Sequence, residues 1–128
     1  MSGKILIIDD DSDFKEAMST LLEAKGYKVV TAENGKEGIE KIKNEKPNLV
    51  MLDVMMTHKS EGFDVARAVD SDPSIKGTPI IITSGIRKEM NLSFGFEPDE
   101  TYLPVKAVLE KPVKPDALLN EVKKHIRK

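Results

Sequence analysis

The chain has 128 residues, of which 39% are hydrophobic and 33% are charged. This length suits one domain, and the hydrophobic content is too high for an intrinsically disordered chain. The net charge is only -2, there is no cysteine, and no apolar run is long enough to span a membrane. These values exclude a disulfide-stabilised protein and a thiolate metal site. They predict one cytoplasmic domain over residues 1–128 that contacts neither nucleic acid nor membrane.

Five short apolar runs alternate with longer amphipathic segments along the chain. The runs cover residues 5–8, 29–32, 49–52, 79–84 and 107–110. Runs such as ILII and LVML are apolar at every position, which is typical of strands in a parallel sheet covered on both faces. The run at 29–32 is less apolar and fits an edge strand.

The segments between the runs have the apolar spacing of helices. Three stripes consist of Phe14, Ala17, Met18, Leu21 and Leu22; of Gly38, Ile39 and Ile42; and of Phe63, Ala66 and Val69. Gly26 follows the first stripe where a C-cap belongs, and Asn34 precedes the second as an N-cap. Pro115 predicts the first turn of a last helix, whose stripe is Leu118, Leu119, Val122 and Ile126.

Residues 85–106 are the weak link in this alternation. A helix is expected here, but Gly95, Pro98 and Pro104 interrupt it. We therefore expect the fourth helix to be short or degraded within an atypical loop. Since parallel strands require right-handed crossovers, the whole pattern predicts an α/β sandwich around a parallel sheet.

Polar residues stand directly after the apolar runs. Asp9 and Asp10 follow the first run, Asp53 follows the third, Thr83 ends the fourth, and Lys111 follows the fifth. Each alone has a purely structural explanation, such as a helix-dipole charge, a turn or β-propensity. Together they favour a ligand site, because ligands of open parallel sheets bind beyond the carboxyl ends of the strands.

The residue types at these positions indicate the chemistry of the site. Carboxylates without His or Cys select a hard cation, in the first place Mg²⁺, with Mn²⁺ as the alternative. A carboxylate, an ammonium group and a hydroxyl around such an ion favour phosphoryl transfer, with the carboxylate forming an acyl phosphate.

The motifs ILIIDDD, PNLVMLDVMM, PIIITSG and LEKPVKPDALL together resemble the bacterial two-component response regulator receiver domain. The likeness covers essentially the whole chain. Within the family, the chain resembles the single-domain chemotaxis regulators. It implies a flavodoxin-like three-layer sandwich with strand order 2-1-3-4-5. It also implies a phosphorelay switch, not a turnover enzyme, that takes a phosphoryl group from a sensor histidine kinase or a histidine phosphotransfer protein.

The resemblance implies a role for each polar residue. It makes Asp53 both the phosphoacceptor and a ligand of the metal. It makes Asp9 and Asp10 the acidic pair at the metal, with Asp10 in direct contact and Asp9 through water. The remaining members are the backbone carbonyl of Met55 at the metal, the switch hydroxyl of Thr83, and the phosphate-binding Lys111, which precedes a cis bond to Pro112.

Some residues have no such role or depart from the family pattern. Asp11 is expected to face solvent, and Asp13 to place its charge in the first turn of a helix. Thr57 replaces a usual proline, and Val108 replaces the aromatic that usually moves with the switch hydroxyl. Residues 85–106 are longer than usual, and the output partner is not indicated.

Two alternative functions fit part of the pattern. A degenerate receiver that serves only as an interaction module would explain Val108, although the complete polar set opposes it. A phosphohydrolase of the haloacid-dehalogenase type would use Asp9 and Asp11 as a D-x-D pair. That family places a threonine where this chain has Asp13.

Overall fold

The protein forms a three-layer α/β sandwich. The computed structural model describes residues 3–53, 61–84, 106–110 and 113–126, without the side chains of 61–64, 84, 108 and 110. The strands are β1 (Lys4–Ile8), β2 (Lys28–Ala32), β3 (Leu49–Asp53), β4 (Ile80–Ser84) and β5 (Ala107–Glu110). They are parallel, in the order β2-β1-β3-β4-β5. The predicted sheet, including β2 at an edge, is therefore confirmed.

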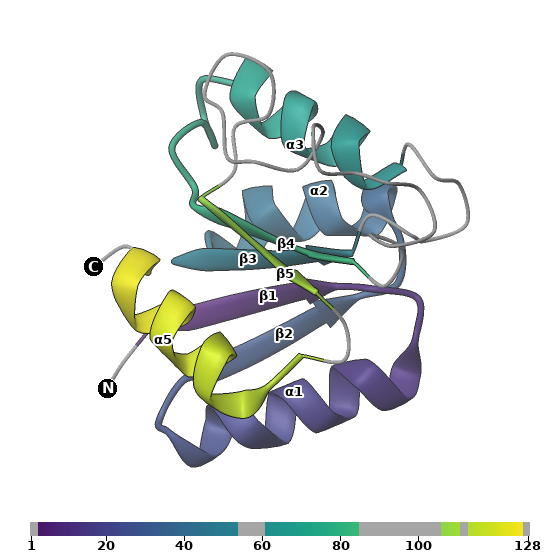
Figure 1. Ribbon diagram of the computed structural model, residues 1–128. Coiled ribbons are helices and arrows are strands. Elements are labelled where there is room, and N and C mark those ends of the chain that lie inside the picture. The colour runs from purple at the N-terminus through teal and green to yellow at the C-terminus, as the bar shows by residue number, and fades with distance from the viewer. Residues whose placement is uncertain (1–2, 54–60, 85–105, 111–112, 127–128) are drawn as a thin grey trace.

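Helices cover both faces of this sheet. Those in the described residues are α1 (Ser12–Ala24), α2 (Gly35–Glu45), α3 (Glu61–Ser71) and α5 (Pro115–His125). Figure 1 shows α1 and α5 on one side of the sheet and α2 and α3 on the other. The fourth helix expected in 85–106 falls on residues that are almost all outside the described part. Among the described helices, none is both long and apolar enough to cross a lipid bilayer.

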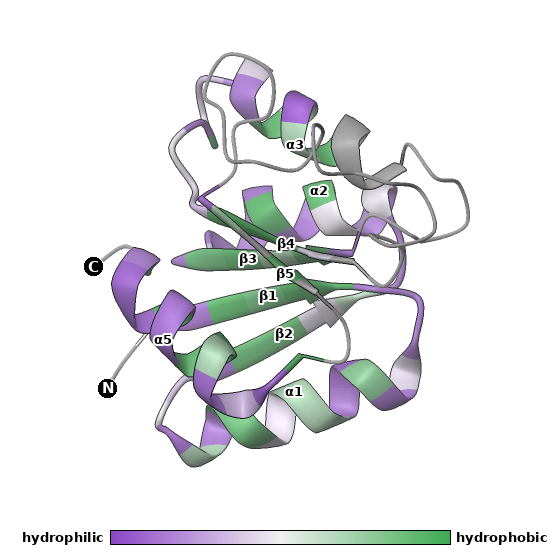
Figure 2. Cartoon of the chain, viewed as in Figure 1, coloured by the Kyte–Doolittle hydropathy of each residue, from purple (hydrophilic) through white to green (hydrophobic). Residues whose placement is uncertain are grey.

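The core consists of two apolar layers separated by the sheet. Strand side chains alternate between the layers, as the pleat requires. The layer beneath α1 and α5 contains Ile5, Ile7, Leu49, Met51 and Ile81, and the opposite layer contains Leu6, Ile8, Val50, Leu52 and Ile80. Figure 2 shows largely hydrophobic strands between helices that carry both hydrophilic and hydrophobic residues. The strands are apolar throughout because both of their faces are buried.

The ends of α1 are defined by side-chain and backbone hydrogen bonds. Asp11 is the N-cap, and its side chain accepts a hydrogen bond of 3.1 Å from the backbone N–H of Phe14. At the other end, Gly26 has φ of +93°, and the N–H of Tyr27 donates to the carbonyl of Leu22 at 3.2 Å. This left-handed turn with its return hydrogen bond is the Schellman arrangement that ends many helices. The predicted position of Gly26 is confirmed, and Asp11 has a structural role that the sequence interpretation had not assigned to it.

The inner face of α1 differs from the predicted stripe at one position. Ala17 is exposed, whereas Lys15 is buried, at 8% relative exposure, in line with Met18 and Leu22. The three buried residues follow the spacing i, i+3 and i+7. Relative to the predicted stripe, the buried face of α1 is therefore turned about the helix axis by less than the angle between successive residues. The prediction missed Lys15 because only apolar residues were counted.

Helix α2 approaches β1 closely through a glycine. Its N-cap is Asn34, whose side chain accepts a hydrogen bond of 2.8 Å from the N–H of Glu37, as predicted. A Cβ atom built on Gly38 would collide with the side chain of Ile8, the last residue of β1. The absence of a side chain at Gly38 therefore lets α2 lie against the strand that carries the acidic residues.

Candidate functional site

The alternation of strand side chains brings three predicted site residues to the same side of the sheet. Asp9, Asp53 and Thr83 each stand two positions after a strand residue that packs beneath α1 and α5. Asp53 and Thr83 are direct partners in the register of β3 and β4. The pairing of Ile8 with Leu52 places Asp9 and Asp53 next to each other where β1 and β3 end. We call the end of the sheet at which the strands terminate, on the face beneath α1 and α5, the carboxyl edge.

Three carboxylates converge at the carboxyl edge and form what we call the acid cluster. Asp9, Asp10 and Asp53 each offer an oxygen, and these oxygens all lie within 4.8 Å of one another. Asp9 and Asp53 are buried, with relative exposures of 0% and 3%, whereas Asp10 is exposed. The carboxylate of Asp9 is also fixed by the backbone, because its Oδ1 accepts a hydrogen bond of 2.9 Å from the N–H of Asp11. The cluster is therefore fixed on its inner side and open to solvent on its outer side.

The arrangement fits a small divalent cation. Two carboxylates at this separation repel each other by roughly 3–4 kcal/mol at an effective dielectric constant of about 20. A cation would remove that repulsion, and oxygen-only donors suit Mg²⁺. Ligands of one Mg²⁺ lie at most roughly 4.2 Å apart. Oxygens that all lie within 4.8 Å of one another could therefore meet at one such ion, directly or through a bound water.

The hydroxyl of Thr83 belongs to the same edge, and two other predicted site residues lie outside the described part of the chain. Thr83 is 1% exposed, next to Asp53 in the sheet. Strand β5 ends at Glu110, immediately before Lys111. Lys111 and its bond to Pro112 are not among the described residues, and neither are Met55 and Thr57.

Two residues at the start of α1, of which Asp11 contacts the acid cluster, were not given a role from the sequence. Asp11 connects the cluster to the start of α1, because its N–H donates to Asp9 and its side chain caps the helix. Lys15 lies one turn further along, and its N–H donates to the carbonyl of Asp11 at 3.1 Å. The capping role of Asp11 was predictable from its position before a helix, since Asp is a favoured N-cap.

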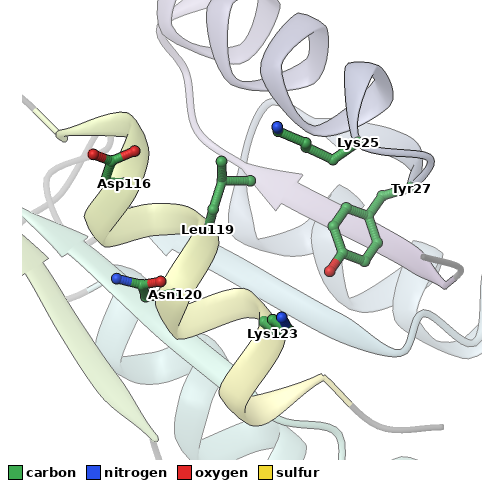
Figure 3. A pocket seen from close by; sticks show the side chains of 6 residues that line it. All are labelled: Lys25, Tyr27, Asp116, Leu119, Asn120 and Lys123. Carbon is green, nitrogen blue, oxygen red and sulfur yellow. The ribbon is translucent and has the colours of Figure 1, made fainter.

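A groove on the same side of the molecule is separate from the acid cluster. It has a volume of about 310 Å³ and is lined by Lys25, Tyr27, Asp116, Leu119, Asn120 and Lys123. Figure 3 shows that the ring of Tyr27 extends toward α5, from which four of these side chains come. None of the predicted site residues lines this groove. Those predicted polar residues that the structure describes thus gather at the acid cluster and the neighbouring Thr83.

Comparison with known proteins gives a consistent family. The sequence model of the response regulator receiver domain matches residues 5–123. The chain is 32% identical over 126 residues to "Transcriptional regulatory protein CpxR homolog" of Haemophilus influenzae, covering 98% of this chain and 51% of that protein. It is 29% identical over 120 residues to "Protein PilH" of Pseudomonas aeruginosa, covering 94% of both chains.

Solved structures show the same fold. A putative response regulator from Chloroflexus aurantiacus superimposes with a TM-score of 0.82 at 27% identity, covering 97% of both chains. The present chain spans about half the length of the curated transcriptional regulators that it matches, at 50% and 51%. Its similarity to them is therefore a similarity to one of their domains.

Proposed function

The chain belongs to the response regulator receiver family, and on that basis we propose that it is a phosphoacceptor switch whose acceptor is Asp53. The observation that carries the residue assignment is the convergence of Asp9, Asp10 and Asp53 within 4.8 Å at the carboxyl edge. Asp53 is the member in direct register with Thr83, so a group attached to it would have a hydroxyl donor next to it.

The proposed reaction transfers a phosphoryl group between side chains. A carboxylate oxygen of Asp53 attacks the phosphorus of a phosphohistidine on the donor protein. The P–O bond to Asp53 forms as the P–N bond to the imidazole breaks, and the released imidazole nitrogen takes a proton from solvent. The product is an acyl phosphate, which water later hydrolyses to restore Asp53. Asp53 therefore both carries the phosphoryl group and loses it by hydrolysis.

The neighbouring residues position and stabilise the transferred group. Mg²⁺ bound by Asp9, Asp10, Asp53 and the carbonyl of Met55 would neutralise charge on the phosphoryl oxygens. Thr83 would donate a hydrogen bond to one oxygen, and Lys111 would pair with another. The acyl phosphate carries about two negative charges at neutral pH, where the free carboxylate carries one, so these donors bind the phosphorylated state more tightly than the free state. That difference in interaction energy is what moves the switch.

The partners follow from this chemistry. The donor is a sensor histidine kinase or a histidine phosphotransfer protein, in the cytoplasm where such donors act. The receiver signals by protein contacts to an output protein or an output domain. No feature of the described residues favours the alternatives of a turnover phosphohydrolase or an inert interaction module.

Intact-mass measurement after incubation with a small acyl phosphate and Mg²⁺ tests the proposal. We expect the wild-type chain to gain the mass of one phosphoryl group and Asp53→Asn to gain none. Asp13→Asn, which removes an exposed acid outside the cluster, is the matched control and should label normally. Continued labelling of Asp53→Asn would place the acceptor elsewhere, and an unlabelled wild-type chain that also fails to bind Mg²⁺ would indicate the degenerate module. Turnover of a phosphate ester that depends on Asp9 would indicate the phosphohydrolase.

A further inference from the structure

The groove between the end of α1 and α5 is built around one buried tyrosine. Tyr27 has a relative exposure of 4% and belongs to the apolar layer beneath α1 and α5. Its hydroxyl points across the groove toward the stretch of α5 between Leu119 and Lys123 (Figure 3). In the part of the chain that the structure describes, no hydrogen bond of this hydroxyl is found. A buried tyrosine usually gives its hydroxyl a partner, so the groove contains an unused polar group on an apolar ring.

One wall of the groove is a single face of α5. The lining residues of this helix follow the spacing i, i+3, i+4 and i+7, which places them on one side: Asp116, Leu119, Asn120 and Lys123. Asp116 in the first turn and Lys123 in the last turn are about 10 Å apart along the helix axis. The half-buried side chain of Leu119 lies between them. The wall therefore runs from an acidic end over an apolar middle to a basic end.

The charges of the lining favour an anion. Lys25, the C-cap residue of α1, adds a second ammonium group, so the lining carries two positive charges and one negative charge. Within the described ranges neither Lys25 nor Lys123 forms an ion pair. The ammonium group of Lys123 and the hydroxyl of Tyr27 are hydrogen-bond donors on opposite walls of the groove. Two such donors beside an apolar surface suit the two oxygens of a carboxylate that is attached to an apolar group.

We propose that this groove binds a small organic carboxylate whose apolar part is about the size of one ring. The ring of Tyr27 and the side chain of Leu119 would cover the apolar part, and Lys123 and the Tyr27 hydroxyl would each bind one carboxylate oxygen. The volume of about 310 Å³ lies near the lower limit of roughly 300 Å³ for small-molecule sites. Because the groove is separate from the acid cluster, this site does not depend on whether Asp53 accepts a phosphoryl group.

The first test is an NMR titration of the isotopically labelled full chain in EDTA, with phenylacetate as the probe. We expect saturable chemical-shift changes at the backbone amides of Tyr27 and Asn120 at up to about 20 mM phenylacetate. Phenylacetamide keeps the ring without the charge, and acetate keeps the charge without the ring. Each should bind at least about fivefold more weakly. Absence of saturable shifts with phenylacetate, or equally strong binding of acetate or inorganic phosphate, would overturn the proposal.

The second test uses variants that keep the fold. Tyr27→Phe retains the ring and removes only the hydroxyl, so it should weaken phenylacetate binding about three- to tenfold without destabilising the protein. Lys123→Gln should weaken binding about two- to fivefold. Lys124 stands in the same last turn of α5 but does not line the groove, so Lys124→Gln is the matched control and should change the affinity less than about twofold. Equal effects of Lys123→Gln and Lys124→Gln, or an unchanged affinity in Tyr27→Phe, would refute the assigned contacts.

Discussion

Asp9 contributes to the site through two different kinds of contact. Its carboxylate faces the acid cluster, and the same group accepts the hydrogen bond from the N–H of Asp11, which lies at the start of α1. Removing the charge and removing the acceptor are therefore different perturbations. Substitutions at this one residue can separate the metal site from the helix that begins beside it.

We predict that Asp9→Asn and Asp9→Ala weaken Mg²⁺ binding to a similar extent but differ in stability. Both remove the negative charge, whereas only Ala removes the acceptor for the N–H of Asp11. The Asn variant should be more stable than the Ala variant by about 0.5–1.5 kcal/mol, the usual net value of one hydrogen bond. Urea denaturation in EDTA measures this difference. Equal stability of the two variants would mean that the bond to Asp11 contributes nothing.

The packing of α2 against β1 depends on Gly38, which has no side chain. Replacing an exposed helical glycine by alanine normally stabilises a protein by up to about 1 kcal/mol, because glycine is a poor helix former. At Gly38 the new methyl group would meet the side chain of Ile8, with Cγ1 at 2.8 Å and Cγ2 at 3.2 Å. Here crowding and helix propensity oppose each other, so the sign of the effect is informative.

We predict that Gly38→Ala destabilises the protein by roughly 1–3 kcal/mol through overpacking. The cost should be smaller in an Ile8→Ala background, because that change removes the atoms with which the methyl group collides. Chemical denaturation of the two single variants and the double variant measures the coupling. A stabilising Gly38→Ala would show that α2 can move away from β1 without loss.

The elements themselves were largely predictable, and the exceptions have physical causes. Runs that are apolar at every position identify strands covered on both faces, and the cap at Asn34 and the turn at Gly26 identify helix ends. Periodicity failed at Ala17, which is exposed, and at Lys15, which is buried although only apolar residues were counted; the stem of a lysine can pack against apolar neighbours. The convergence of Asp9, Asp10 and Asp53 was expected, because the carboxyl ends of parallel strands meet at one edge of a sheet. The distances between their oxygens could be known only from the register in which the strands pair.

At the scale of the whole molecule, the sheet has a second charged edge opposite the acid cluster. The ammonium group of Lys4 at the start of β1 donates to Oε1 of Glu45 at 2.9 Å, and its backbone N–H donates to Asn48 at 2.8 Å. The hydrogen bond from the ammonium group of Lys4 and the positive charge of that group hold the pKa of Glu45 below its usual range. Hydrogen bonds from Ser74, followed by the charge of Lys43, likewise lower the pKa of Asp72.

We predict that the protein loses stability in acid partly through this edge. A carboxyl whose pKa is lower in the folded state stabilises the protein above its unfolded pKa, and this contribution disappears as the pH falls through the folded pKa. The free energy of unfolding should thus decline from about pH 5 downward. Glu45→Gln should make that decline shallower, and Glu40→Gln, on the same helix, is the control. Equal pH profiles for wild type and Glu45→Gln would refute the contribution.

The strand order has a consequence for how the chain is made. The first pairing, between β1 and β2, is complete in the first 32 residues, and β3 then adds to the free side of β1. Strand β4 adds to β3, and β5 adds to β4, so no strand has to insert between two that are already paired. A polypeptide leaving the ribosome from its N-terminus can therefore extend the sheet in the order in which its strands emerge. The residues of the acid cluster that follow β1 and end β3 can come together before β4 has emerged.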